Sequence, residues 1–193
     1  MSVKQQLETE EAELWVVDMQ DKLLPMIVGR EAVVFACVLM ARAARLLGLP
    51  LLCTEHYPTG LGRMTASLRE AVGESARWIE KTIFSCCVAE AVRRHLAESG
   101  RRQIILVGIE AHVCVQQTAL ELLRLGFQPY VCADAVGSRH ELDYDVALLR
   151  MQQAGAVVTT AEAVIYELLG EAGHPAFKQI IELIKTADRE RPS

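Results

Sequence analysis

The sequence predicts a single α/β domain in which a parallel sheet is covered by helices on both faces. Short apolar runs rich in Val, Ile and Leu recur along the chain, as in strands that are buried on both faces. Segments of roughly a dozen residues with apolar side chains at helical spacing separate these runs. The length of 193 residues fits one domain, residues 1–193, with a core at about 12–186.

The first half of the chain carries three predicted strands and three predicted helices. Residues 1–12 have a polar, acidic composition and are expected to lead into the first strand. The first helix is expected to stop at Gly48 and Pro50, and residues 56–62 have the proline and glycine content of a loop. The expected strands are 13–18, 51–54 and 76–80, and the expected helices are 30–47, 65–73 and 89–98.

The second half repeats the alternation. Gly126 and Gly155 follow helical patterns and are expected to end them. The expected strands are 104–109, 127–133 and 156–160, and the expected helices are 113–125, 141–153, 161–169 and 175–187.

Composition narrows the class of function. The net charge of −5 argues against nonspecific nucleic-acid binding, which needs a basic surface. No apolar run approaches the ~20 residues of a membrane span, and the polar start is unlike a signal peptide. The six cysteines lack metal-ligand spacing and mostly lie in apolar runs, as buried hydrophobic residues do. We therefore expect a cytoplasmic protein with no membrane contact, no cofactor and no metal.

Three chemically reactive residues lie where predicted strands end. Cys114 follows the strand at 104–109 and precedes a helix, where free N–H groups and the helix dipole favour a thiolate. Asp18 ends the first strand, and Lys81 follows the strand at 76–80. Because parallel strands bring their carboxyl ends to one edge, these three side chains are expected to converge there.

The three side chains suit nucleophilic attack on a carbonyl group. Asp18 can take the proton of the Cys114 thiol and return it to a leaving amine, and Lys81 can keep Asp18 ionised. Each residue also has a plainer interpretation: a core cysteine, a helix cap and a solvated lysine. His112 is expected to point away from Cys114, the adjacent Cys86 and Cys87 are expected to pack in the core, and Glu55 and His56 lack a second histidine at ligand spacing.

These residues occur in three segments, 16–20, 80–85 and 108–115. In that order the segments resemble the signatures of the isochorismatase-like cysteine hydrolases. Residues 54–62 and 174–178 are similar to the isochorismatase domain-containing subgroup. The resemblance covers roughly residues 12–186. It implies a three-layer fold with a six-stranded parallel sheet and a catalytic triad of Asp18, Lys81 and Cys114.

The resemblance also implies a cis peptide bond between Ile109 and Glu110. This bond would direct the N–H groups of Glu110 and Cys114 into one oxyanion hole. Leu23, Tyr57 and Phe84 flank loops at the same sheet edge and are expected to line the substrate pocket. A homo-oligomer, as a dimer, a tetramer or a larger ring, is expected as in other family members.

Two departures from the family narrow the expected reaction. The nicotinamidase branch has an Asp-x-His metal site after the second strand, whereas this chain has Thr54, Glu55 and His56 there. Isochorismatases that cleave a vinyl ether need not keep the cysteine, so Cys114 favours a small amide or related C–N substrate and a thioester intermediate. Ether hydrolysis, a binding or assembly role without catalysis, and a redox role of Cys114 remain alternatives.

Overall fold

The computed structural model describes residues 6–192 and contains a six-stranded sheet with strand order β3-β2-β1-β4-β5-β6. All neighbouring strands run parallel, which confirms the predicted fold class. The strands are β1 (Ala12–Val17), β2 (Leu51–His56), β3 (Arg77–Lys81), β4 (Gln103–Ile109), β5 (Gln128–Gly137) and β6 (Val157–Thr159).

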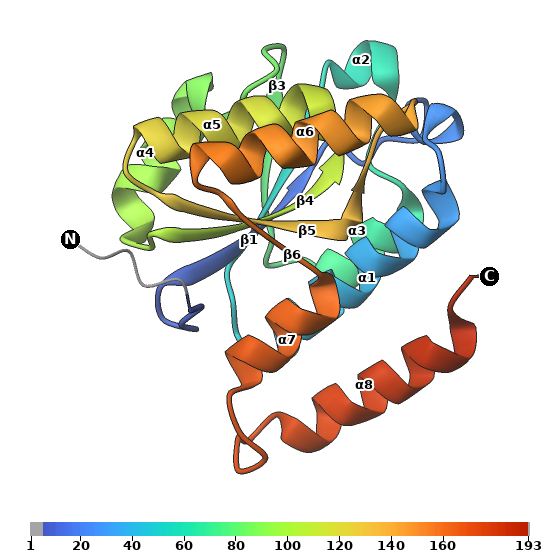
Figure 1. The fold of residues 1–193 in the computed structure, drawn as a ribbon, viewed down its shortest axis with the longest axis vertical. Helices are drawn as coiled ribbons and strands as arrows, with labels where there is room; N and C mark the ends of the chain where they lie inside the picture. The colour runs from blue at the N-terminus through green and yellow to red at the C-terminus, as the bar shows by residue number, and fades with distance from the viewer. Residues whose placement is uncertain (1–5, 193) are drawn as a thin grey trace.

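Helices form a layer on each face of the sheet (Figure 1). α1, α3, α7 and α8 lie on one face, and α4, α5 and α6 lie on the other. Within residues 6–192 no helix is long and apolar enough to cross a membrane. The helices are α1 (Arg30–Leu46), α2 (Pro58–Leu61), α3 (Ala66–Val72), α4 (Glu90–Ser99), α5 (Gln116–Arg124), α6 (Glu141–Ala154), α7 (Ala161–Leu169) and α8 (Phe177–Glu190).

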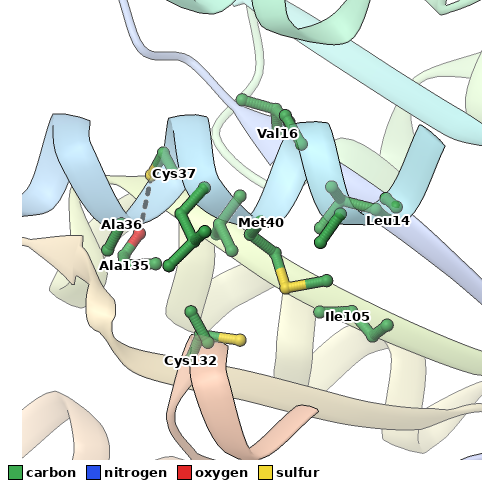
Figure 2. Packing of buried hydrophobic residues seen from close by; sticks show 14 of the residues in the cluster. Leu14, Val16, Ala36, Cys37, Met40, Ile105, Cys132 and Ala135 are labelled. Carbon is green, nitrogen blue, oxygen red and sulfur yellow. Dashed lines mark hydrogen bonds between the residues drawn. The ribbon is translucent and has the colours of Figure 1, made fainter. Parts of the chain in front are cut away.

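The central strands are buried along their whole length, as their apolar sequences predict. Successive side chains of a strand point to opposite faces, so β1 contributes to both apolar clusters. Leu14 and Val16 pack beneath α1, beside Cys37 and Cys132 (Figure 2). Trp15 joins the cluster beneath α4, α5 and α6. All six cysteines are buried and free, and most of them therefore act as small core residues.

Three element boundaries differ from the prediction. The segment 56–62 contains the short helix α2, because Pro58 occupies a first helical position that suits its fixed φ. β5 continues to Gly137, past a register irregularity opposite Leu106 and Gly108. The helix expected from residue 113 consists of a π-helical turn at Ala111–Val115 followed by α5.

The order in which strands are added to the sheet reverses at the β1–β4 pair: β2 and β3 lie on one side of β1, and β4 to β6 lie on the other. Ligands bind at such a point in open parallel sheets. Gly108 makes the close pairing of these strands possible. Its φ is +121°, and a Cβ atom at this position would lie 2.1 Å from the carbonyl oxygen of Val17. A residue larger than glycine at position 108 would therefore push β1 and β4 apart at this edge of the sheet.

Candidate active site

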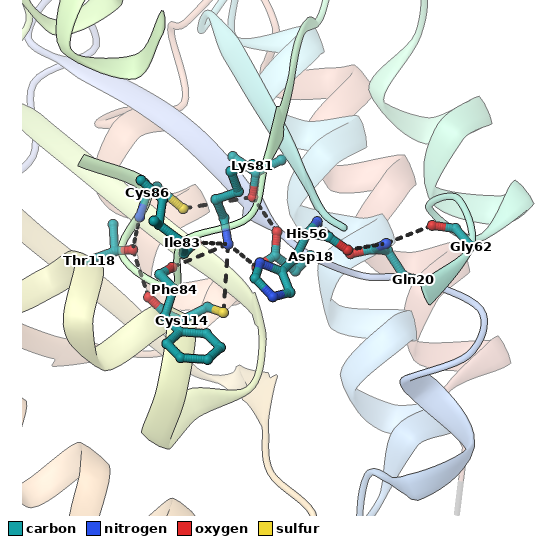
Figure 3. A network of polar contacts seen from close by, with 11 residues as sticks. Asp18, Gln20, His56, Gly62, Lys81, Ile83, Phe84, Cys86, Cys114 and Thr118 are labelled. Carbon is teal, nitrogen blue, oxygen red and sulfur yellow. Dashed lines mark hydrogen bonds and ion pairs between the residues drawn. The ribbon is translucent and has the colours of Figure 1, made fainter. Parts of the chain in front are cut away.

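Three side chains from three different strands meet at the carboxyl edge of the sheet (Figure 3). Lys81 Nζ lies 2.5 Å from Asp18 Oδ2 and 3.6 Å from Cys114 Sγ. Asp18 follows β1, Lys81 is the last residue of β3, and Cys114 lies in the π-helical turn after β4. The Asp18 and Lys81 side chains are at most 1% exposed. The structure thus brings together the three residues that were expected to converge.

Lys81 reaches the other two residues across a neighbouring strand. β2 lies between β1 and β3, so the side chains of Lys81 and Asp18 together bridge the roughly 9–10 Å between their backbones. Its ammonium group also donates to the carbonyl oxygens of Ile83 and Phe84, each at 3.2 Å. Burial lowers the pKa of Lys81, but Asp18, followed by Cys86 and Cys114, outweighs burial and raises it overall. The ammonium group of Lys81 is therefore charged. Its three protons face four acceptors, which are the Asp18 carboxylate, the two carbonyl oxygens and the Cys114 sulfur.

Asp18 is oriented by β2 as well as by Lys81. Its backbone has a φ of +51°, and its N–H donates to the carbonyl oxygen of Thr54 at 3.1 Å. The Thr54 hydroxyl donates to Asp18 Oδ1 at 2.7 Å, while the other carboxylate oxygen contacts Lys81. Sequence reasoning missed Thr54, because its contact with Asp18 depends on the register in which β1 and β2 pair.

Replacing Thr54 by Val is expected to lower the free energy of unfolding by about 1–3 kcal/mol. The substitution keeps the shape of the side chain but removes the only hydroxyl on Asp18 Oδ1 among the contacts of residues 6–192. A buried carboxylate oxygen that loses its donor pays its full desolvation cost. Denaturant unfolding measures the change, and Thr54→Ser, which keeps the hydroxyl, should lose less. Equal losses for both variants would contradict this role.

Cys114 carries its proton in the free protein. Its sulfur lies 3.6 Å from Lys81 Nζ, which in turn pairs with the Asp18 carboxylate. Burial and the negative charge of Asp18 raise the pKa of Cys114, and the opposing effect of Lys81 is smaller. This direction is opposite to the one expected from the helix position, because α5 begins only at Gln116 and the thiol is buried. Asp18 is therefore positioned to receive the thiol proton.

The turn that carries Cys114 is attached to the end of β5. The Ile109–Glu110 peptide bond is cis. The Glu110 carboxylate accepts from Nε of Arg139 at 2.9 Å, and His112 Nδ1 lies 2.9 Å from Ser138 Oγ. His112 therefore points away from the thiol, as predicted.

The three residues expected to line the pocket lie in different places. Phe84 joins the site through its carbonyl oxygen, and its ring is half-exposed. Tyr57 is half-exposed and donates its N–H to the carbonyl oxygen of Lys81 at 2.8 Å. Leu23 packs against the apolar cluster beneath α1, and its place in the pocket stays a prediction.

Cys86 and Thr118 also adjoin the three residues. Cys86 Sγ lies 3.7 Å from the Thr54 hydroxyl, and its N–H donates to Thr118 Oγ1 at 3.0 Å. The Thr118 hydroxyl donates in turn to the carbonyl oxygen of Cys114 at 2.6 Å. Cys86 is buried, as expected of a core residue, but it packs beside the site. Residues 6–192 contain no cluster of three or more His, Cys, Asp or Glu placed to hold a metal ion.

A cavity of about 500 Å³ lies between α1 and α8 and is lined by residues that include Leu24, Phe35 and Leu183. These side chains belong to the apolar cluster beneath α1, whereas Cys114 belongs to the cluster on the other face. The cavity therefore does not enclose the thiol.

Sequence comparison matches residues 13–163 to the isochorismatase domain model. Isochorismatase domain-containing protein 2 of Pongo abelii is 42% identical over 173 residues, which are 89% of this chain and 82% of the relative. Isochorismatase domain-containing protein 2A of Mus musculus is 39% identical over the same shares of both chains.

Solved structures show the same architecture. A structure described as the MAR1 ribonuclease from Caenorhabditis elegans has 38% identity and a TM-score of 0.90, covering 97% of this chain and 95% of the other. YcaC from Escherichia coli, described as an octameric hydrolase of unknown specificity, has 24% identity and a TM-score of 0.87. It covers 99% of this chain and 93% of its own, and at this identity the likeness concerns the fold alone.

Proposed function

The chain belongs to the isochorismatase family of hydrolases, and from that premise we propose that it cleaves a small amide or related C–N substrate through Cys114. One observation carries the proposal: the Cys114 sulfur lies 3.6 Å from Lys81 Nζ, beside a buried Asp18–Lys81 ion pair. A thiol becomes a strong nucleophile when an adjacent base takes its proton. Asp18 is that base, and Lys81 is its electrostatic partner.

The reaction proceeds in two stages. As Asp18 takes the thiol proton, the sulfur forms a bond to the substrate carbonyl carbon. Asp18 then returns the proton to the leaving nitrogen while the C–N bond breaks and a thioester remains. Water attacks the thioester, Asp18 takes a proton from it, and the C–S bond breaks to release the acid. The thiolate regains the proton from Asp18, which completes the cycle.

The negative oxygen of each tetrahedral intermediate needs hydrogen-bond donors. We assign this role to the backbone N–H groups of Glu110 and Cys114, on the turn held by Arg139 and Ser138. One such donor contributes roughly 2.7–4 kcal/mol to transition-state stabilisation in other enzymes. We assign the half-exposed side chains of Tyr57 and Phe84 to the wall of the substrate pocket.

Cleavage of RNA is a second candidate, because the Caenorhabditis elegans relative is described as a ribonuclease. The site favours a neutral substrate. The charge of Lys81 is balanced by Asp18 at 2.5 Å, and the chain has a net charge of −5. A polyanion such as RNA therefore gains little electrostatic attraction from this site.

The test is a substrate panel of small primary amides, secondary amides, esters and a single-stranded RNA. Acid and amine release are followed by NMR, and RNA cleavage is followed on gels. The proposal expects turnover of amides that depends on Cys114. Turnover of RNA alone, or of isochorismate without any need for Cys114, would contradict it.

The alkylation rate of Cys114 is expected to rise continuously with pH from about 6 to 9. The thiolate reacts, and burial and Asp18 raise the pKa of this thiol, so the thiolate fraction keeps increasing past the ~8.5 of a free cysteine. Iodoacetamide labelling followed by peptide mass spectrometry measures the rate, with glutathione as the free-thiol control. A rate that levels off below pH 7 would show a preformed thiolate and contradict this assignment.

A homo-oligomer remains a prediction for this chain. α6 exposes three apolar side chains at helical spacing, namely Leu142, Val146 and Leu149. Exposed apolar stripes of this kind are common at interfaces between protein chains.

A further inference from the structure

A buried ring nitrogen without a partner lies beside the three reactive residues. His56 is the last residue of β2 and is in register with Lys81 of β3. Among the contacts within residues 6–192, its Nδ1 is one of two buried side-chain nitrogen or oxygen atoms that have no hydrogen-bond partner. Buried polar atoms are nearly always paired, so this nitrogen is a candidate to bind a group from outside the described chain, such as a water molecule or a substrate.

The backbone of His56 is fixed on both sides by one amide group. Gln20 Oε1 accepts the N–H of His56 at 2.7 Å, and Gln20 Nε2 donates to the His56 carbonyl oxygen at 3.0 Å. The imidazole packs against the Phe84 ring, with 5.4 Å between ring centroids. His56 is in register with Lys81, whose ammonium nitrogen lies 3.6 Å from the Cys114 sulfur. The ring therefore projects from a fixed point next to Lys81 (Figure 3).

The imidazole is neutral at neutral pH. Burial, followed by the positive charge of Lys81, lowers the pKa of His56 below its usual 6.5, and the opposing effects of Asp18 and the Ile83 carbonyl are smaller. A neutral imidazole has one N–H group and one lone pair. Nδ1 has no hydrogen-bond partner among the described residues, and we take it as the nitrogen that carries the lone pair.

We propose that Nδ1 of His56 accepts a hydrogen bond from an N–H group of the substrate, so that the site selects primary or N-monosubstituted amides over esters of the same shape. This inference rests on the proposed function and names its substrate class. An amide N–H next to the reacting carbonyl gives Nδ1 the partner that it lacks. An ester or a fully substituted amide leaves Nδ1 buried and unpaired, which weakens its binding.

The experiment compares N-methyliodoacetamide with methyl iodoacetate, which share shape and reactive carbon but differ in the N–H group. In both reactions the sulfur of Cys114 forms a bond to the CH₂ carbon, iodide leaves, and the thiol proton passes to buffer. Peptide mass spectrometry gives the two second-order rate constants for Cys114. Their ratio is divided by the same ratio for glutathione, which removes the intrinsic difference in reactivity.

The wild-type protein is expected to prefer N-methyliodoacetamide by about three- to tenfold after this correction, as one hydrogen bond can provide. His56→Leu, which has no acceptor, should bring the corrected ratio to about one. His56→Gln, whose amide oxygen can accept, should keep part of the preference. Thermal unfolding verifies that both variants fold. No preference in the wild type, or the same preference in His56→Leu, would overturn the inference.

Failure of this inference is distinguishable from failure of the proposed function. If amide turnover requires Cys114 but the corrected labelling ratio is the same in the wild type and in His56→Leu, the proposed hydrolase activity is supported and the role of His56 is overturned. If the ratio depends on His56 but amide turnover survives Cys114→Ala, His56 recognises N–H groups and the covalent mechanism fails. If neither reagent labels Cys114, both are overturned.

Discussion

Cys114→Ala is expected to lower kcat by at least about 10⁴-fold for every amide that the wild-type protein hydrolyses. Removal of the nucleophile in other covalent hydrolases costs this much or more, because the remaining groups cannot form the covalent intermediate. Cys86, the other cysteine in electrostatic contact with Lys81, cannot replace it easily, since its side chain is fully buried and burial raises its pKa to about 11.

The matched control is Cys132→Ala. Cys132 is fully buried in the cluster beneath α1, on the other face of the sheet, so this variant loses a thiol but no reactive group. It should keep nearly the full kcat. Thermal unfolding establishes that both variants fold before their rates are compared. Cys114→Ala activity above about a tenth of wild type would contradict the nucleophile and would favour ether-type chemistry.

Asp18→Asn and Lys81→Met are each expected to lower the free energy of unfolding by about 3–5 kcal/mol. Each substitution leaves one charge of a fully buried ion pair without its partner. The double variant contains neither charge and should recover most of that loss, since neutral side chains of similar size tolerate burial. All three variants should lose hydrolysis, because Asp18 carries the proton and Lys81 keeps it ionised.

Denaturant unfolding of the four proteins gives a double-mutant cycle, and amide turnover is measured on the same samples. Recovered stability together with absent activity separates the structural role of the pair from its catalytic role. Losses that simply add in the double variant would show that the two charges are not coupled. Full activity in Asp18→Asn would remove Asp18 from the mechanism.

Local sequence revealed the strands and the reactive residues for one physical reason. The apolar runs of β1 and β4 are buried on both faces, so their composition is diagnostic, and Asp18 and Cys114 follow them directly. Because neighbouring strands are parallel, residues that follow different strands share one edge. Lys81 was placed by the same reasoning, although it proved to be the last residue of β3.

The supporting residues could not be found in this way. Thr54 acts on Asp18 because of the register that pairs Val17 with Thr54, which emerges only when β1 and β2 meet. His56 depends on the amide group of Gln20, 36 residues earlier. The pKa of Cys114 was expected to fall at a helix start, but burial raises it, and burial is a property of the packed molecule.

The central claim is a thioester on Cys114 during turnover. The most direct measurement is mass spectrometry of protein that is quenched in acid while it hydrolyses an active amide, followed by peptide mapping. The account predicts that the acyl mass appears on the peptide containing Cys114 and is absent from the Cys114→Ala variant. An acyl mass on another residue, or steady turnover with Cys114 unmodified at every quench time, would contradict it.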